Sequence, residues 1–101
     1  MLEMIAKMFK GTNYKELISQ GAVIVDVRTP GEFKSGHIKG SKNIPLNTIS
    51  KKALDIKKWN KTVVVCCASG MRSGQAKSIL KNNGIEAHNG GGWSSLQYKI
   101  K

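Results

Sequence analysis

Thr62-Val-Val-Val-Cys-Cys-Ala-Ser-Gly-Met-Arg-Ser73 is the stretch that decides the fold of this 101-residue chain. Residues 62–67 are a continuous, mainly β-branched and apolar run, which is typical of a strand buried on both faces of a parallel sheet. Ser69 and Gly70 interrupt the apolar run, so the strand ends at Cys67 and a loop follows. Apolar residues at helical spacing over Ser73–Asn83, stopped by a glycine, predict a helix after the loop.

A second buried strand is predicted earlier in the chain, where Ala22-Val-Ile-Val-Asp-Val27 is again β-branched. Thr29-Pro-Gly-Glu32 is a capping box with proline at the first helical position, which predicts a brief helix through Lys34. Weaker patterns predict a helix over residues 14–20, a strand over 41–44, a helix carrying Ile49, Ala53 and Ile56, a strand over 85–89 and a last helical turn carrying Trp93 and Leu96. Strands alternating with helices predict an α/β fold with a mainly parallel sheet covered on both faces.

The length of the chain allows one domain with one core, so residues 1–101 are expected to form a single domain. Met1–Gly11 reads as an N-terminal extension. Within it, Met1–Phe9 is apolar but interrupted by Glu3 and Lys7, which favours an amphipathic helical turn over a signal peptide or a membrane span. We expect a cytoplasmic monomer with no membrane partner; an exported protein seen without its signal peptide is the alternative.

The chain is strongly basic, with seventeen Lys and Arg against six Asp and Glu and a formal net charge of +11. Such a charge attracts anions, although a lysine-rich surface also serves solubility alone. No basic cluster interleaved with aromatics and no zinc-finger spacing is found, so nucleic acid is not expected as a partner. Only Arg28 and Arg72 are arginines, and both lie inside the motifs described below.

The only cysteines, Cys66 and Cys67, are neighbours, a pattern that fits neither a disulfide framework nor a zinc site. Cys66 fits a buried strand residue, because successive strand side chains face opposite sides. Cys67 lies where the strand ends and the loop begins. Backbone N–H groups of that loop, the start of the following helix and the charge of Arg72 would favour its thiolate, which is the reactive form.

The loop Cys67-Ala-Ser-Gly-Met-Arg-Ser73 resembles the active loop of rhodanese-type sulfurtransferases, in which the cysteine forms a persulfide. Two other regions resemble the family in the same order along the chain. They are an N-terminal signature (Asp26-Val-Arg28, Glu32-Phe33, Gly36-His-Ile38, Gly40 and Asn43-Ile-Pro45) and a C-terminal turn (Gly90-Gly-Gly-Trp93). The resemblance runs from about residue 13 to the C-terminus.

This resemblance implies a three-layer α/β/α sandwich around a mainly parallel, about five-stranded sheet, although the family's first strand is not obvious in Met1–Gly11. It implies that Cys67 takes sulfur from a donor such as thiosulfate and passes it to cyanide, a thiol or a protein acceptor, with no metal and no organic cofactor. The substrate-binding loop would be Ala68, Ser69, Gly70, Met71, Arg72 and Ser73. The family often has tyrosine before the nucleophile, where this chain has Cys66.

Supporting roles are predicted for three further residues. Arg28 is two residues from Asp26 and four from Glu32, so these side chains are expected to form a structural brace under the loop. His37 is expected to be packed and hydrogen-bonded and not to act as a base. The glycines over 90–92 lack dinucleotide-binding spacing and are expected to pass close to the active loop.

Two alternatives remain beside sulfur transfer to a small acceptor. Cysteine-dependent phosphatases and arsenate reductases resemble this loop but use Cys-x5-Arg, whereas the spacing from Cys67 to Arg72 is Cys-x4-Arg. The other alternative is a persulfide relay or redox-sensing module that docks a protein partner.

Overall fold

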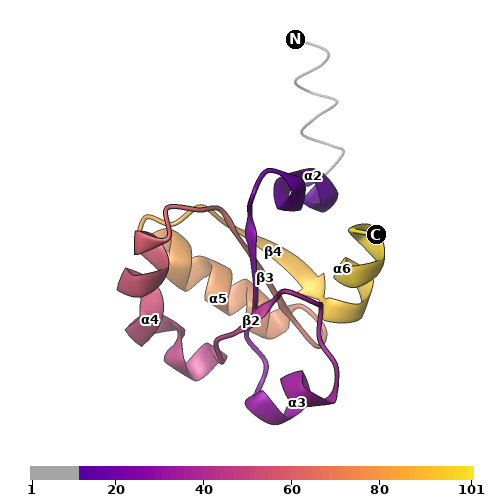
Figure 1. Cartoon of the computed structure of the whole chain (residues 1–101). Helices are drawn as coiled ribbons and strands as arrows, with labels where there is room; N and C mark the ends of the chain where they lie inside the picture. The colour runs from indigo at the N-terminus through magenta and orange to yellow at the C-terminus, as the bar shows by residue number, and fades with distance from the viewer. Residues whose placement is uncertain (1–11) are drawn as a thin grey trace.

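The computed structural model describes residues 12–101, which form a four-stranded sheet flanked by helices (Figure 1). All neighbouring strands are parallel and their order is β2-β1-β3-β4. The strands are β1 (Val23–Asp26), β2 (Lys42–Asn43), β3 (Val63–Cys67) and β4 (Ala87–Gly92). The resemblance implied about five strands, and residues 12–101 contain four. The predicted extension Met1–Gly11, with its amphipathic turn, lies outside the described residues.

Helices cover both faces of the sheet, which confirms the three-layer α/β/α architecture (Figure 1). Helices α4 (Leu46–Lys58) and α5 (Met71–Asn82) pack against each other on one face. Helices α2 (Tyr14–Ser19) and α6 (Trp93–Lys99) cover the other face, and α3 (Pro30–Ser35) follows the carboxyl end of β1. None of the helices within residues 12–101 is long and apolar enough to cross a membrane.

The central strand β3 is buried along its whole length because both of its faces meet apolar layers. Val63, Val65 and Cys67 belong to the core beneath α4 and α5. Val64 and Cys66 belong to the core beneath α2 and α6. The two adjacent cysteines therefore face opposite sides of the sheet, as the alternation of strand side chains predicts.

Side chains cap the N-termini of the short helices α3 and α2. Thr29 accepts the backbone N–H of Glu32 at 3.3 Å, and the Glu32 carboxylate accepts the backbone N–H of Thr29 at 3.1 Å, which completes the capping box of α3. The side chain of Asn13 caps α2 by accepting the N–H of Glu16 at 3.1 Å.

Two elements, α5 and β4, differ from expectation by two residues or more at an end. Helix α5 begins at Met71 instead of Ser73, because Gly70 precedes it with φ 104° and so turns the chain sharply into the helix. Strand β4 spans Ala87–Gly92 instead of 85–89, so the glycines are part of the sheet and not a turn after it. Glycine has a low propensity for strands. Here, however, the glycines let β4 lie close to β3, where a side chain would collide with the atoms of β3.

Candidate active site

Cys67 is the last residue of β3, and its sulfur lies inside the loop that follows. The residue is 1% exposed. Its Sγ accepts hydrogen bonds from the backbone N–H of Gly70 at 2.9 Å and of Ser73 at 3.4 Å, and the Ser73 hydroxyl lies 3.3 Å away. The end of the strand, the left-handed Gly70 and the first turn of α5 together form this ring of donors.

The environment of Cys67 favours its thiolate. Burial of the thiol raises its pKa, but hydrogen bonds from the Ser73 hydroxyl and from the backbone N–H groups of Ser73, Gly70 and Ser69 outweigh that effect, so the pKa is lowered. Cys66 is the opposite case, because burial, followed by the nearby Asp26 carboxylate, raises its pKa to about 12. Of the two thiols, Cys67 is the one whose surroundings favour the reactive thiolate.

Arg72 and Glu32 form an ion pair that joins α5 to α3. The two guanidinium nitrogens donate to the two carboxylate oxygens at 2.7 and 2.9 Å, and both side chains are about one third exposed. The hydrogen bonds from Arg72, followed by that from the Thr29 backbone, lower the pKa of Glu32 to about 2. The expectation that Glu32 braces Arg28 with its carboxylate is wrong: Arg28 meets only the Glu32 carbonyl, at 3.3 Å.

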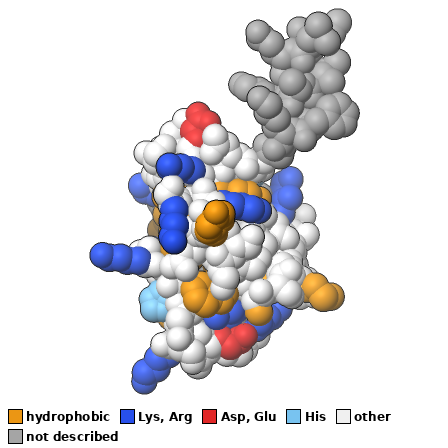
Figure 2. Space-filling model, turned by 90° about the vertical axis from the view of Figure 1, so that its right-hand side faces the viewer, with side chains coloured by type: hydrophobic (Ala, Val, Ile, Leu, Met, Phe, Trp, Pro, Cys, Tyr) orange, Lys and Arg blue, Asp and Glu red, His pale blue; other side chains and the backbone are white. Residues whose placement is uncertain are grey.

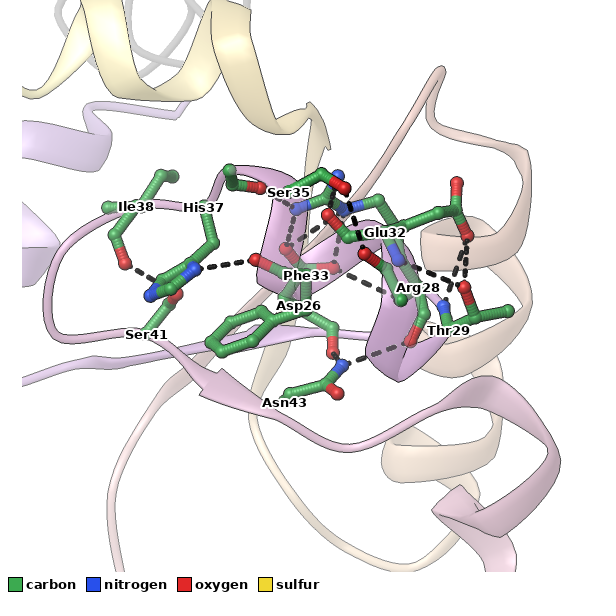
Figure 3. Close-up of polar contacts among 12 residues, drawn as sticks. Asp26, Arg28, Thr29, Glu32, Phe33, Ser35, His37, Ile38, Ser41 and Asn43 are labelled. Carbon is green, nitrogen blue, oxygen red and sulfur yellow. Dashed lines mark hydrogen bonds and ion pairs between the residues drawn. The ribbon is translucent and has the colours of Figure 1, made fainter.

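Arg28 and Asp26 form a second pair, which is buried (Figure 3). Arg28 Nη2 donates to Asp26 Oδ2 at 2.7 Å and to the Gly36 carbonyl at 2.6 Å, and the guanidinium lies 4.8 Å from the ring centre of Trp93. Asn43 donates to the backbone carbonyls of Asp26 and Arg28, both at 3.0 Å. This pair joins β1, β2, α3 and α6, so its geometry is that of a structural brace.

His37 lies at the surface of this region, next to Phe33 (Figure 3). Its Nδ1 is 2.7 Å from the Phe33 carbonyl oxygen and its ring stacks on the Phe33 ring at 3.7 Å. The expectation of a packed, hydrogen-bonded histidine is confirmed.

The glycines of β4 bring its backbone against the active loop, as expected. A Cβ atom on Gly92 would lie 2.8 Å from the Ala68 carbonyl oxygen, and one on Gly70 would lie 3.5 Å from the Gly91 Cα. Gly91 itself has φ +81°, a conformation that favours glycine. The ladder between β3 and β4 shifts register here, between Val65 and Cys67.

Asn89 is a site residue that sequence reasoning missed. Its side chain joins β4 to the middle and to the end of the active loop, through Gly70 and Ser73. In the sequence, an asparagine before glycines is typical of a turn, so it gave no sign of a role in the site. The parallel pairing of β4 with β3 brings Asn89 next to the loop.

The remaining loop residues lie at the surface. Ala68 and Ser69 are exposed, and Met71 is 78% exposed beside Arg72. A mostly apolar hollow of about 270 Å³ opens next to Arg72; it is lined by Val27, Thr29, Pro45, Leu46, Asn47 and Arg72. Within residues 12–101, no three His, Cys, Asp or Glu side chains come together in a group that could hold a metal ion.

The comparison with known proteins shows the family of the chain. The Rhodanese-like domain family matches residues 11–98. The chain belongs to that family. This rhodanese-like domain is 40% identical over 74 residues to thiosulfate sulfurtransferase PspE of Escherichia coli (strain K12), covering 71% of each chain.

Two further relatives support the assignment. The domain is 40% identical over 82 residues to the uncharacterized protein YqhL of Bacillus subtilis (strain 168), and that match covers 79% of this chain but 64% of the relative. A solved structure described as rhodanese with anions from E. coli superposes with a TM-score of 0.67 at 36% identity, covering 74% of this chain and 91% of that one.

Proposed function

We propose that this rhodanese-like domain is a sulfurtransferase that moves sulfane sulfur from a thiosulfate-type donor to a thiophilic acceptor as a persulfide on Cys67. The observation that carries the proposal is the ring of N–H and hydroxyl groups around the Cys67 sulfur, at 2.9–3.4 Å. This ring compensates negative charge on sulfur before any substrate binds, which is the requirement for a reactive thiolate and for an anionic persulfide.

In the first step the Cys67 thiolate attacks the outer sulfur of thiosulfate. A bond forms between Sγ and that sulfur, the sulfur–sulfur bond of thiosulfate breaks, and its electron pair leaves with sulfite. The enzyme then carries Cys67–S–S⁻. In the second step cyanide or a thiolate attacks the outer sulfur, so that thiocyanate or a new persulfide leaves and the Cys67 thiolate returns.

Arg72 is the residue proposed to receive the donor's sulfonate group. Two of its five N–H groups are used by Glu32, and its side chain is 35% exposed, so further donors remain for an anion. Glu32 holds the guanidinium in place beside the loop. Asp26 and Arg28 hold the surrounding elements together and take no part in the chemistry, because the pair is buried and its hydrogen bonds lie within the brace.

The role of Cys67 is tested by intact-protein mass spectrometry after mixing with thiosulfate. We expect the wild type and Cys66→Ala to gain one sulfur atom that cyanide removes, and Cys67→Ser to gain none. The same preparations should transfer sulfur from thiosulfate to cyanide while leaving aryl phosphates intact. Sulfur on Cys66 in Cys67→Ser, or efficient phosphatase turnover without sulfur transfer, would overturn the proposal.

A protein acceptor is the second candidate for the sulfur. Met71, a large apolar side chain, is 78% exposed at the rim of the loop, where an acceptor chain would approach Cys67. Redox sensing through a Cys66–Cys67 disulfide is disfavoured, because the two thiols face opposite sides of the sheet and would need backbone movement to bond.

A further inference from the structure

Asn89, in strand β4, spans the active loop with its side-chain amide. Its Oδ1 accepts from the Ser73 hydroxyl at 2.7 Å and from the Gly91 N–H at 2.9 Å. Its Nδ2 donates to the Gly70 carbonyl at 3.1 Å. Ser73 and Gly70 are the same residues whose N–H groups point at the Cys67 sulfur.

The orientation of this amide is fixed by its surroundings. A rotated amide would place its NH₂ against the Gly91 N–H and its oxygen against the Gly70 carbonyl, and both contacts would be repulsive. The backbone carbonyl of Asn89 accepts a hydrogen bond from the Tyr14 hydroxyl of α2 at 2.7 Å, which holds the backbone that carries the amide. A Cβ at position 74 would lie 3.4 Å from Asn89 Nδ2, so the glycine there leaves room for the amide.

We propose that Asn89 is a positioning residue of the active loop, which holds the Gly70 peptide and Ser73 around the sulfur of Cys67. It touches no substrate and acts only through these two residues. The inference deepens the proposed sulfur transfer and rests on it only for the effect on turnover.

Two physical effects follow from this arrangement. Gly70 turns the chain with φ 104°, and the bond from Asn89 to the Gly70 carbonyl holds the Gly70–Met71 peptide, which directly follows the residue whose N–H lies 2.9 Å from Sγ. The Ser73 hydroxyl has one hydrogen and two acceptors, Asn89 Oδ1 at 2.7 Å and Cys67 Sγ at 3.3 Å. The amide therefore influences how much of that hydrogen is available to the thiolate.

Asn89→Asp tests the inference with almost no change in shape. A carboxylate puts an oxygen against the Gly70 carbonyl, binds the Ser73 hydrogen more strongly and adds a negative charge two hydrogen bonds from Sγ. All three effects disfavour the thiolate, and a charge at this range raises a pKa by about one unit or more. The charged pairs near Cys67, Arg72–Glu32 and Arg28–Asp26, are unchanged in the variant, and Cys66 is replaced by alanine in every protein that is compared.

Asn83→Asp is the matched control. Asn83, at the end of α5, also donates its amide to a backbone carbonyl, that of Ile79 at 2.8 Å, but it is exposed and bonds to no loop residue. The two variants make the same chemical change and the same change in net charge. Asn83→Asp shows what the same change does away from the loop, whereas the alanine variants described below remove the Asn89 amide without adding a charge and so separate its hold on the loop from the effect of the charge.

The measurement is the rate of iodoacetamide alkylation against pH, with every variant in a Cys66→Ala background so that only Cys67 reacts. We expect the midpoint to rise by about one pH unit or more in Asn89→Asp and to stay at the parent value in Asn83→Asp. At a pH well below the parent midpoint the rate should fall about tenfold in Asn89→Asp. An unchanged midpoint in folded Asn89→Asp would overturn the inference.

If Asn89→Asp does not fold, Ser73→Ala is compared with Ser73→Ala/Asn89→Ala. Without the Ser73 hydroxyl, loss of the amide acts through the hold on the loop peptides, so the midpoint should be higher in the double variant; equal midpoints would contradict the inference. Alkylation needs no sulfur transfer. It therefore decides the role of Asn89 even if Cys67 takes up no sulfur in the loading experiment. In the same way, the loading experiment decides the role of Cys67 even if the alkylation midpoint does not move.

Discussion

Cys66 and Cys67 carry identical side chains, and only their places on β3 distinguish them. Cys66 lies in the apolar core under α2 and α6, where burial raises its pKa to about 12. Cys67 is just as inaccessible, but its burial is opposed by hydrogen bonds from the loop, which lower its pKa. At the scale of single residues, the direction in which a sulfur points decides its reactivity.

The lowered pKa of Cys67 predicts the pH dependence of the reaction. The group reacts as the anion, so its rate rises with pH through the pKa and then levels off; a lowered pKa moves that rise below the ordinary thiol value of about 8.5. Alkylation of Cys66→Ala against pH measures the midpoint. A midpoint at or above that of free cysteine would contradict the assigned role of the loop.

The Arg72–Glu32 pair predicts a separate effect on donor binding. Arg72→Ala should raise the Michaelis constant for thiosulfate, and Arg72→Lys should raise it less, because lysine keeps the charge but loses the planar fork of donors. Steady-state kinetics with thiosulfate and cyanide measure both constants. A wild-type Michaelis constant for thiosulfate in both variants would show that Arg72 does not bind the donor.

The same pair predicts how stability depends on pH. The pKa of Glu32 is lowered to about 2 in the folded protein, so its contribution is present above the unfolded value of 4.5 and is lost as the pH falls through 2. The free-energy difference of unfolding between wild type and Glu32→Gln should therefore be larger at pH 7 than at pH 2.5. Urea denaturation at the two pH values measures it; because the side chain is exposed, we expect the difference to be small.

At the scale of elements, the close packing of β4 on β3 depends on missing side chains. A Cβ on Gly90 would lie 2.9 Å from both Val64 Cγ1 and Leu96 Cδ2, and 3.1 Å from the Val65 carbonyl oxygen. These neighbours belong to the central strand and to α6, so they cannot give way without disturbing the core. The element that carries Asn89 to the loop is therefore held in place by a glycine.

Gly90→Ala should destabilise the fold by about 1–3 kcal/mol, as expected for overpacking a dense core. Gly31→Ala is the control, because nothing lies within 4 Å of a Cβ there and alanine favours the helix α3; its stability should be unchanged or higher by up to about 1 kcal/mol. Urea denaturation compares the two. Equal stability of both variants would show that β4 can move away from β3.

At the scale of the whole molecule, the net charge of +11 is a property of the surface and not of the loop alone. Figure 2 shows Lys and Arg side chains spread over the face in view and not gathered in one cluster. A distributed positive field attracts an anionic donor from a distance and weakens as salt shortens its range to about 10 Å at 0.1 M.

Inert salt is therefore expected to raise the Michaelis constant for thiosulfate more than it lowers turnover. Kinetics at low and physiological ionic strength, repeated with two different salts to separate screening from specific anion inhibition, measure the effect. A flat response would mean that the lysines serve solubility alone.

The sequence by itself determined the features that depend on neighbours along the chain. The β-branched runs predicted β1 and β3, the capping box predicted α3, and the alternation of side chains predicted opposite directions for the two cysteines. These features follow from local hydrogen bonds and from the two-residue period of a strand. The motif spacing also indicated the loop, because its residues are consecutive.

Only the tertiary structure decided which distant side chains meet. The Glu32 carboxylate pairs with Arg72, forty residues later in the chain, and not with Arg28. Asn89 bonds to Ser73 of the loop, which lies sixteen residues earlier in the chain. The extension of β4 through its glycines likewise depends on the space that Val64 and Leu96 leave. Such contacts are set by the parallel order of the strands, which brings their carboxyl ends to one edge, and no local pattern specifies which side chains will face one another there.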